Sequence, residues 1–138
     1  MRILGLDVGT VRIGVAQSDP MKILASSTEV IVRKTPKADA ERVAYLVKTL
    51  QAEKIVVGLP LQMNGEEGQS VKMVKDFVEV LRPMVEGTEI VFQDERLSTV
   101  SAQRMLIEAD MRREKRKGVV DKVAATIILQ NYLDKQKR

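Results

Sequence analysis

A run of apolar residues near the start of the chain, residues 3–8, is interrupted by one carboxylate, that of Asp7. Such a run predicts a strand that is buried on both faces of a sheet. Burying an ionised carboxylate is costly, so Asp7 must change its pKa, accept hydrogen bonds or bind a cation. Gly9 and Thr10 follow directly and predict a tight turn into a second apolar stretch. We therefore expect the chain to begin with a hairpin and Asp7 to lie at the centre of an active site.

The rest of the hydrophobic pattern alternates strands with helices. Strands are expected over residues 2–8, 12–18, 24–32, 54–58 and 88–93, and helices over residues 37–52, 71–81, 98–109 and 119–133. Residues 61–69 are expected to form a loop, either a simple turn or a lid that contacts the substrate. A three-stranded meander followed by helix crossovers implies a single α/β domain over residues 1–138, with a mixed sheet and helices on its faces.

Composition narrows the chemistry that this chain can perform. Its 138 residues include neither His nor Cys, which excludes Ser-His and Cys-His nucleophiles and ordinary zinc sites. Carboxylates remain, and they select Mg²⁺ or Mn²⁺. The net charge of +4 allows an anionic partner. The sequence has neither a run long enough to span a membrane nor a signal-peptide pattern, and with the absence of Cys this favours the cytoplasm.

Two further positions carry candidate acids. Asp94 and Glu95 stand at the end of the fifth expected strand, where their side chains point to opposite faces, so one of them at most should serve the site. Arg96 falls on the side of Asp94 and can neutralise it, which makes Glu95 the better ligand; an exposed, ion-paired turn is the alternative. Asp121 is expected in the first turn of the last helix, where the helix dipole alone would also favour an acid. Three such carboxylates can hold two divalent cations about 4 Å apart and activate a water for attack on a phosphodiester.

A strongly basic connector is expected between residues 110 and 118, directly before Asp121. Its cations, together with one in the following helix, are Arg112, Arg113, Lys115, Arg116, Lys117 and Lys122. A run of charges is most often a solvated loop. Next to a carboxylate metal site, however, basic side chains suit the phosphate backbone of a nucleic acid. Aromatic residues are scarce, so recognition of backbone or shape is expected rather than base stacking.

Five segments together resemble the bacterial Holliday-junction-resolvase-like proteins, which are also described as nucleases that mature the 5′ end of pre-16S ribosomal RNA. The segments are Gly5-Leu6-Asp7-Val8-Gly9-Thr10, Arg12-Ile13-Gly14-Val15-Ala16, Val57-Gly58-Leu59-Pro60-Leu61-Gln62-Met63-Asn64-Gly65, Asp94-Glu95-Arg96-Leu97-Ser98-Thr99 and Asp121-Lys122-Val123-Ala124-Ala125. The resemblance implies a ribonuclease-H-like fold, the sheet order 3-2-1-4-5, and metal-dependent hydrolysis of phosphodiesters in the cytoplasm.

By position, Asp7, Glu95 and Asp121 match the acidic triad of that family. The chain departs from the wider superfamily at residues 55–58, a fourth strand without an acid. Glu95 must therefore reach Asp7 from the fifth strand, two strand spacings or about 9.5 Å away.

The leading hypothesis is an endonuclease that uses two Mg²⁺ or Mn²⁺ ions and acts as a monomer or weak homodimer on structured nucleic acid, in particular precursor ribosomal RNA. One alternative keeps the chemistry and takes a four-way DNA junction as substrate. A second is a non-catalytic RNA-binding factor. An ATP-binding module is a third, since Asp7-Val8-Gly9-Thr10 also suits phosphate binding, but such ATPases close two related domains on the nucleotide and 138 residues are too few for both.

Overall fold

The computed structural model describes residues 1–60, 68–94 and 113–136, and of residues 113–122 it describes the backbone alone. Within these residues a five-stranded sheet has the order β3-β2-β1-β4-β5. The strands are β1 (Arg2–Val8), β2 (Arg12–Ser18), β3 (Ala25–Val32), β4 (Ala52–Leu59) and β5 (Glu89–Asp94). The first three form an antiparallel meander, whereas β4 and β5 run parallel to the central strand β1. The expected mixed sheet and its order 3-2-1-4-5 are confirmed.

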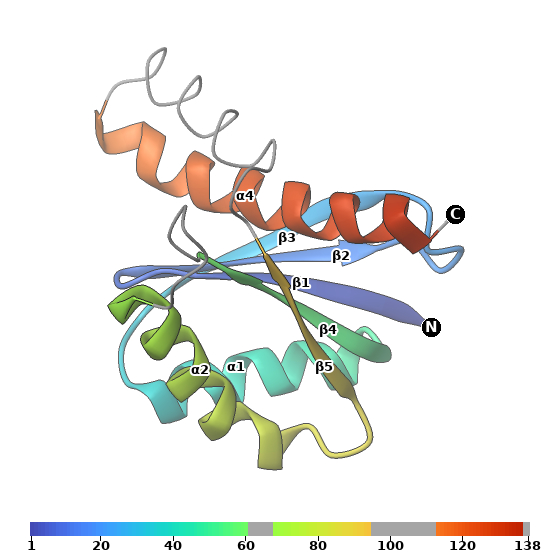
Figure 1. Ribbon diagram of the computed structural model, residues 1–138, viewed down its shortest axis with the longest axis horizontal. Coiled ribbons are helices and arrows are strands. Elements are labelled where there is room, and N and C mark those ends of the chain that lie inside the picture. Colours follow the sequence, from blue (N-terminus) through green and yellow to red (C-terminus); the bar gives the residue numbers. More distant parts are fainter. Residues whose placement is uncertain (61–67, 95–112, 137–138) are drawn as a thin grey trace.

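Helices cover both faces of the sheet (Figure 1). One face is covered by α1 (Pro36–Thr49) and α2 (Gln69–Leu81), which is extended by the short 3₁₀ helix η1 (Arg82–Met84). The other face is covered by α4 (Arg113–Gln136). The α/β architecture with helices on both faces is therefore as expected. None of the helices in the described parts of the chain is both long and apolar enough to cross a lipid bilayer.

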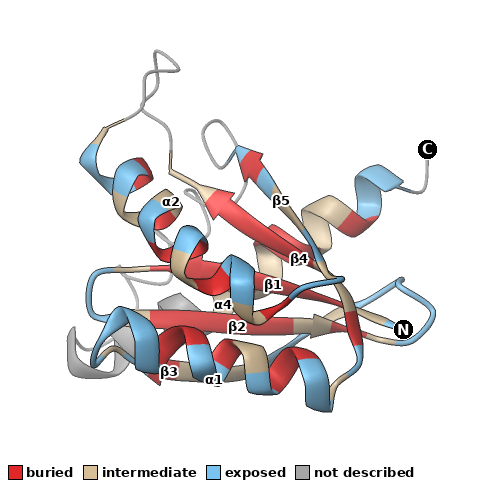
Figure 2. Cartoon of the chain, turned by 90° about the horizontal axis from the view of Figure 1, so that it is seen from below, coloured by how far each residue is buried: buried red, intermediate tan, exposed pale blue. Residues whose placement is uncertain are grey.

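Strand alternation divides the apolar side chains between two cores. In β1, Leu4, Leu6 and Val8 belong to the core beneath α1 and α2, while Ile3 belongs to the core beneath α4. The strands in the middle of the sheet are buried along most of their length (Figure 2). We refer below to the α1/α2 face and the α4 face of the sheet.

The boundaries of two helices differ from those expected. Helix α1 ends at Thr49 rather than residue 52, because Gln51 adopts a left-handed φ of 54° and lets β4 begin at once. Helix α4 begins at Arg113 rather than residue 119, so the expected basic connector is helical from residue 113 onward. Its Arg, Lys and Glu residues are good helix formers, and one glycine at residue 118 does not interrupt them. The helix expected over residues 98–109 and most of the expected loop over residues 61–69 lie outside the described residues.

Candidate active site

Asp7 is the next-to-last residue of the central strand and is buried, with 9% of its surface exposed. Side chains alternate along β1, so Asp7 shares a face with Ile3 and Gly5, the face that α4 covers. The sequence-based expectation of a buried carboxylate at the end of a central strand is confirmed.

The residues beside Asp7 in the sheet are small. Asp7 pairs with Gly14 of β2. On the other side Leu6 pairs with Val57, so the next residue of β4, Gly58, follows alongside Asp7. Both neighbours are glycines, so neither places a side chain beside the carboxylate.

Helix α4 packs directly on the backbone of β1. A Cβ atom placed on Gly5 would lie 2.8 Å from Leu129 Cβ and 3.1 Å from the Ala125 carbonyl oxygen, so only glycine allows this approach. At the far end of the helix, Lys54 Nζ donates to Tyr132 Oη over 2.8 Å, and Lys54 pairs with Ile3 at the start of β1. The earlier part of β1 thus lies near the later part of α4, and the two elements run antiparallel (Figure 1).

This packing gives the level of the Asp121 backbone relative to the sheet. Asp121 precedes Ala125 by four residues, which is about 6 Å along a helix. Asp7 follows Gly5 by two residues, which is about 6.6 Å along a strand. Because α4 and β1 are antiparallel, both steps lead in the same direction, and the backbone of Asp121 comes level with Asp7. Only the backbone of Asp121 is described.

The expected position of Asp121 within its helix was wrong. Helix α4 begins at Arg113, so Asp121 lies in the third turn rather than the first. The helix dipole acts within the first turn and no longer accounts for an acid at this position. The interpretation that competed with a functional role for Asp121 is thereby removed.

Of the two acids at the end of β5, Asp94 lies on the wrong face to join Asp7. Asp94 pairs with Leu59, and Leu59 packs against the core beneath α1 and α2. The side chain of Asp94 is exposed on that face. Asp94 therefore lies on the opposite face of the sheet from Asp7, and Glu95 lies outside the described residues. Among the side chains that the structure describes, no three acids lie close enough to hold a metal ion, and Asp7 is the one expected ligand in that set.

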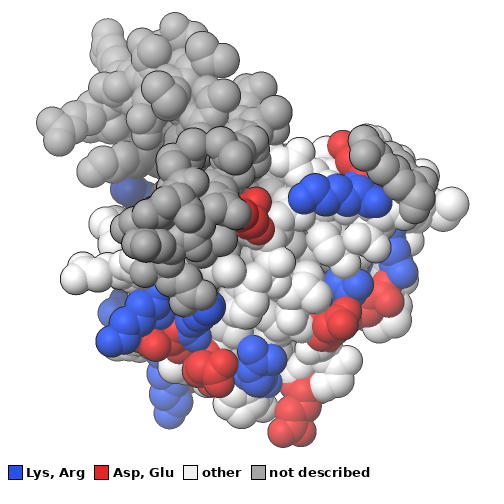
Figure 3. Space-filling view, viewed as in Figure 1, with Lys and Arg blue, Asp and Glu red and all other residues white. Residues whose placement is uncertain are grey.

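The expected nucleic-acid-binding residues lie at the Asp121 end of α4. Arg113, Lys115, Arg116, Lys117 and Lys122 are in the N-terminal half of the helix, and Arg112 lies outside the described residues. Elsewhere, the described part of the face in Figure 3 shows basic and acidic side chains interspersed. Ion pairs between elements join Arg42 to Glu29 and Lys54 to Glu89.

A partly buried ion pair that sequence reasoning missed holds the turn after Asp7. Arg33 Nη1 donates to the Gly9 carbonyl over 3.0 Å, and Arg33 Nε lies 3.2 Å from Asp39 Oδ2. Asp39 is 2% exposed, and the Arg33 guanidinium lies 5.4 Å from the centre of the Phe77 ring. Asp39 also lies in the first turn of α1, where the helix dipole favours an acid, so the sequence pattern alone does not reveal the ion pair. The pair links the β1–β2 turn to both α1 and α2.

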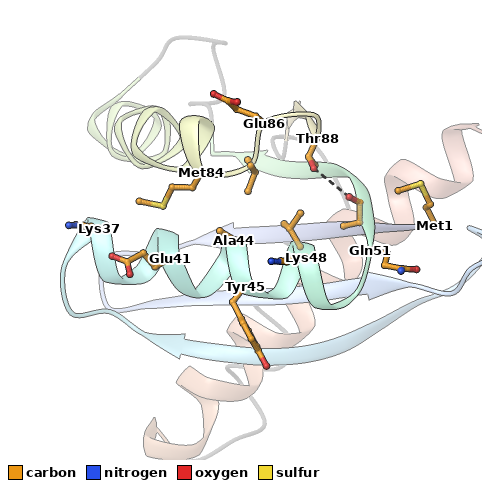
Figure 4. Close-up of a pocket in the computed structure, with 13 residues that line it drawn as sticks. Met1, Lys37, Glu41, Ala44, Tyr45, Lys48, Gln51, Met84, Glu86 and Thr88 are labelled. Carbon is orange, nitrogen blue, oxygen red and sulfur yellow. Dashed lines mark hydrogen bonds between the residues drawn. The ribbon is translucent and has the colours of Figure 1, made fainter.

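A cavity of about 1090 Å³ lies away from Asp7 (Figure 4). It lies between α1 and the segment around η1, and Ala52 and Thr88, at the starts of β4 and β5, contribute to its lining. Asp7 is at the opposite, carboxyl end of the parallel strands. This cavity is therefore separate from the candidate active site.

Comparison with known proteins gives a consistent result along the chain. A family model described as "RuvX: Holliday junction resolvase" matches residues 1–135. A protein of Halothermothrix orenii is 50% identical over 138 residues, covering 100% of this chain and 98% of its own. One from Caldanaerobacter subterraneus subsp. tengcongensis is 51% identical, with 99% of each chain covered. Each of the two carries the name "Putative pre-16S rRNA nuclease".

Solved structures with a similar fold include two resolvases. RuvC of T. thermophilus in complex with a Holliday junction substrate has a TM-score of 0.61 at 12% identity, covering 99% of this chain and 96% of that one. The Fowlpox virus resolvase bound to Holliday junction DNA has a TM-score of 0.52 at 11% identity, with 100% of both chains covered. With the sheet order and the helices on both faces, these matches identify the fold as ribonuclease-H-like.

Proposed function

Because the chain belongs to the RuvX family of Holliday-junction-resolvase proteins, we propose that it is a metal-dependent endonuclease that cleaves phosphodiesters in structured nucleic acid, with precursor 16S ribosomal RNA as its substrate. Asp7, Glu95 and Asp121 are the proposed catalytic acids. The family membership and the full-length relatives named as nucleases support an enzyme of the hydrolase class. Cleavage would take place in the cytoplasm, where precursor ribosomal RNA is made in bacteria.

The observation that carries this proposal is the matched spacing of β1 and α4. Gly5 lies against Ala125 and Leu129. From this contact, two residues along β1 lead to Asp7, and four residues back along α4 lead to Asp121. A buried acid of the strand and the backbone of an acidic residue of the covering helix thus lie at one level. Structural packing alone gives no reason to place a second acidic residue at this level.

Glu95 is the proposed third acid. Asp94 is excluded from the α4 face by its pairing with Leu59, so Glu95 is the acid of this pair that can join Asp7. Gln93 of β5 pairs with Gly58, which lies beside Asp7, so the three residues form one row across the sheet. The Gln93 side chain donates a hydrogen bond to the Ile128 carbonyl of α4. Glu95 follows Gln93 by two residues, in the strand period that keeps side chains on one face.

The proposed acids suit Mg²⁺ or Mn²⁺, since carboxylate oxygens are the ligands that these hard cations prefer. The glycines beside Asp7 in the sheet, Gly14 and Gly58, place no side chain next to its carboxylate. Bound there, the ions would activate a water and stabilise the charge that develops on the attacking and leaving oxygens. The protein itself supplies the rigid strand and helix that hold the acids at fixed separation, and the packed α4 face that limits access of solvent.

The basic residues at the same end of α4 are the proposed contacts to the nucleic-acid backbone. They are Arg112, Arg113, Lys115, Arg116, Lys117 and Lys122. Lys and Arg neutralise phosphates without reading the bases, which fits a substrate recognised by shape.

The choice of RNA over a DNA junction depends on the degree of similarity. The relatives named as pre-16S rRNA nucleases are about half identical to this chain over its whole length. The junction complexes with a similar fold are 11–12% identical, a level that shows the fold alone. A four-way DNA junction, which the family description names, is the second candidate. We propose a monomer or weak homodimer for the RNA enzyme, whereas a resolvase that cuts two strands symmetrically needs a stable dimer.

The test is cleavage of precursor 16S rRNA fragments and of four-way DNA junctions in Mg²⁺ or Mn²⁺, compared with EDTA. Wild-type protein is compared with Asp7→Asn and with Asp76→Asn, a matched change at an exposed acid of α2 on the other face. We expect metal-dependent RNA cleavage by the wild type and Asp76→Asn, and loss of at least about 100-fold in Asp7→Asn.

Three results would contradict the proposal. Equal cleavage by the wild type and Asp7→Asn would show that Asp7 is not catalytic. RNA binding without cleavage, unaffected by EDTA, would identify a non-catalytic RNA-binding factor. Cleavage of the junction alone, by a stable dimer, would replace RNA with DNA as the substrate.

A further inference from the structure

Arg12 lies beside the candidate active site but is not one of its acids or of the cations on α4. It is the first residue of β2, and Gly14, two residues later, pairs with Asp7. Residues two apart in a strand share a face, so Arg12 and Asp7 both lie on the α4 face. Diagonal neighbours of this kind are about 7–8 Å apart between Cα atoms. An arginine side chain spans that distance.

The turn that joins the two residues is held rigidly. The Gly9 amide donates to the Arg12 carbonyl over 2.8 Å, and a Cβ atom on Gly9 would lie 2.8 Å from the same oxygen. The Gly9 carbonyl in turn accepts from Arg33, which is paired with the buried Asp39. The backbone of Arg12 therefore has a fixed position relative to Asp7, and this position depends on main-chain contacts that a change of the Arg12 side chain leaves in place.

The charge of Arg12 has no partner among the described residues. Arg33, Arg42 and Arg82 are each paired with an acid. The Arg12 guanidinium makes neither an ion pair nor a hydrogen bond with any residue that the structure describes. A half-buried arginine normally has an anionic partner, because loss of hydration must be compensated.

Solvent reaches this position from the edge of the sheet. Arg12 pairs with Val32 of the edge strand β3, and Val32 is 61% exposed. Paired residues share a face, so the exposure of Val32 means that solvent reaches the α4 face next to Arg12. Asp7, which lies closer to the middle of the sheet, is buried. An extended anion could contact Arg12 from outside while one of its groups approaches Asp7.

We propose that the guanidinium of Arg12 binds the non-bridging oxygens of a backbone phosphate in the nucleic-acid substrate, next to the phosphodiester held at Asp7. This inference rests on the proposed nuclease function. A guanidinium presents two parallel N–H donors, which match two phosphate oxygens. Arg12 stands on the β2–β3 side of Asp7 and the basic residues of α4 stand on the helix, so the two would hold the backbone from two directions. The strand segment thus contributes to substrate binding independently of the helix.

The experiment measures binding of a precursor 16S rRNA fragment by fluorescence anisotropy in EDTA, where no metal-dependent cleavage occurs, across a series of salt concentrations. The proteins are the wild type, Arg12→Gln, Arg12→Lys and Arg42→Gln. Arg42 is an exposed arginine of α1 paired with Glu29, so Arg42→Gln removes the same charge far from Asp7. Thermal unfolding of each protein is recorded in parallel.

We expect Arg12→Gln to bind about 10-fold more weakly, and the slope of log K against log salt to become shallower by about 0.7–0.9, the value for one phosphate contact. Arg12→Lys should keep most of the slope but recover only part of the affinity, since an ammonium lacks the paired donors. Arg42→Gln should match the wild type in both quantities.

Equal affinity and slope in Arg12→Gln and Arg42→Gln would overturn the inference. A weaker affinity with an unchanged salt slope and a lowered melting temperature would also overturn it, because that combination indicates a structural role. The proposed function fails on a different result, equal cleavage by the wild type and Asp7→Asn, so the two proposals can be separated.

Discussion

Single residues without a side chain set the distances at the candidate site. Gly5 lets the backbone of α4 approach β1, and Gly9 lets the following turn close on the Arg12 carbonyl. In both cases a Cβ atom would fall within 3 Å of another atom, a distance that real contacts do not show. At the residue scale, the geometry of the candidate site depends on the two glycines as much as on the carboxylate of Asp7.

Replacing Gly5 with alanine should displace α4 from the sheet. The new Cβ would overlap Leu129 Cβ, and relieving the overlap should cost about 1–3 kcal/mol of unfolding free energy. Because the displaced helix carries Asp121, we also expect weaker Mn²⁺ binding, measured by isothermal titration. Gly87→Ala is the matched control: Gly87 has a left-handed φ of 87° and open space around it, so alanine strains the backbone by about 1 kcal/mol far from the site. Unchanged Mn²⁺ binding in Gly5→Ala would show that the helix position does not control the site.

Asp19 stabilises the β2–β3 turn in a way that depends on pH. Its Oδ1 accepts hydrogen bonds from the amides of Ile23, over 2.7 Å, and Leu24, over 3.0 Å. These bonds lower the pKa of Asp19, and the bond from Leu24 has the larger effect. A lowered folded-state pKa means that the stabilisation is fully present above the unfolded-state pKa of about 3.9. It is lost as the pH falls through the folded-state pKa.

Asp19→Asn should therefore be less stable than the wild type at neutral pH, with the difference shrinking in acid. Asparagine keeps an oxygen acceptor for both amides but carries no charge that titrates. Urea unfolding of both proteins between about pH 7 and about pH 2 measures the difference in free energy of unfolding. A difference that stays constant over this range would contradict the role given to the Asp19 charge.

At the scale of elements, polar contacts tie α4 to the sheet in its C-terminal half. Gln130 accepts from the Ala25 amide over 2.8 Å and donates to the Ile23 carbonyl over 3.0 Å. Tyr132 accepts from Lys54, and this hydrogen bond, assisted by Glu89, raises the pKa of Lys54. Gln93 of β5 donates to the Ile128 carbonyl over 2.9 Å from a buried position. The half of α4 that carries Asp121 is therefore oriented by contacts made further along the helix.

Gln93 and Gln130 offer a comparison at this scale. Gln93 lies in the sheet row of Asp7 and two residues before Glu95, whereas Gln130 contacts the start of β3. Methionine at either position keeps the length of the side chain and removes its hydrogen bonds. The loss of each hydrogen bond should lower the free energy of unfolding by about 0.5–1.5 kcal/mol. We expect Gln93→Met to weaken Mn²⁺ binding by roughly 10-fold, as loss of a supporting contact near a metal site does, and Gln130→Met to leave it unchanged. Equal effects in the two variants would show that Gln93 acts only on stability.

Across the whole molecule, the sheet separates a structural face from the face that carries the candidate site. The larger core lies beneath α1 and α2, and its Phe77 packs against Arg33 of the Arg33–Asp39 pair. The face beneath α4 carries Asp7 and the small residues beside it. The N-terminus and the C-terminal end of α4 lie at the end of the sheet away from the carboxyl end of β1 (Figure 1).

This division predicts that, of the buried Asp7 and Asp39, only Asp7 is needed for Mn²⁺ to stabilise the folded protein. Mn²⁺ at about 100 times its dissociation constant should stabilise the wild type by about 2.7 kcal/mol, seen as a rise in melting temperature that EDTA reverses. Asp7→Asn should lose that rise. Asp39→Asn should unfold at a lower temperature, since it weakens the partly buried ion pair with Arg33, yet it should retain the full metal-dependent rise. A rise of the same size in Asp7→Asn would place the metal elsewhere.

The sequence by itself determined the kinds of elements, their order and the buried acid at the end of β1. Hydrophobic periodicity records which residues leave water, and Asp7 is conspicuous because a charge inside an apolar run has few physical explanations. The sheet order and the three acids came from the resemblance of motifs to a family. Helix boundaries were less well predicted: nothing in the local pattern of residues 113–118 distinguishes a charged helix from a charged connector.

Only the tertiary structure decided which groups share a face. The pairing of Asp94 with Leu59 removes Asp94 from the site, and the contact of Gly5 with Ala125 and Leu129 brings the Asp121 backbone level with Asp7. The Arg33–Asp39 pair and the place of Arg12 beside Asp7 are likewise tertiary facts. Each depends on strand register and helix packing between residues far apart in the chain, and a local sequence pattern carries no record of these distances.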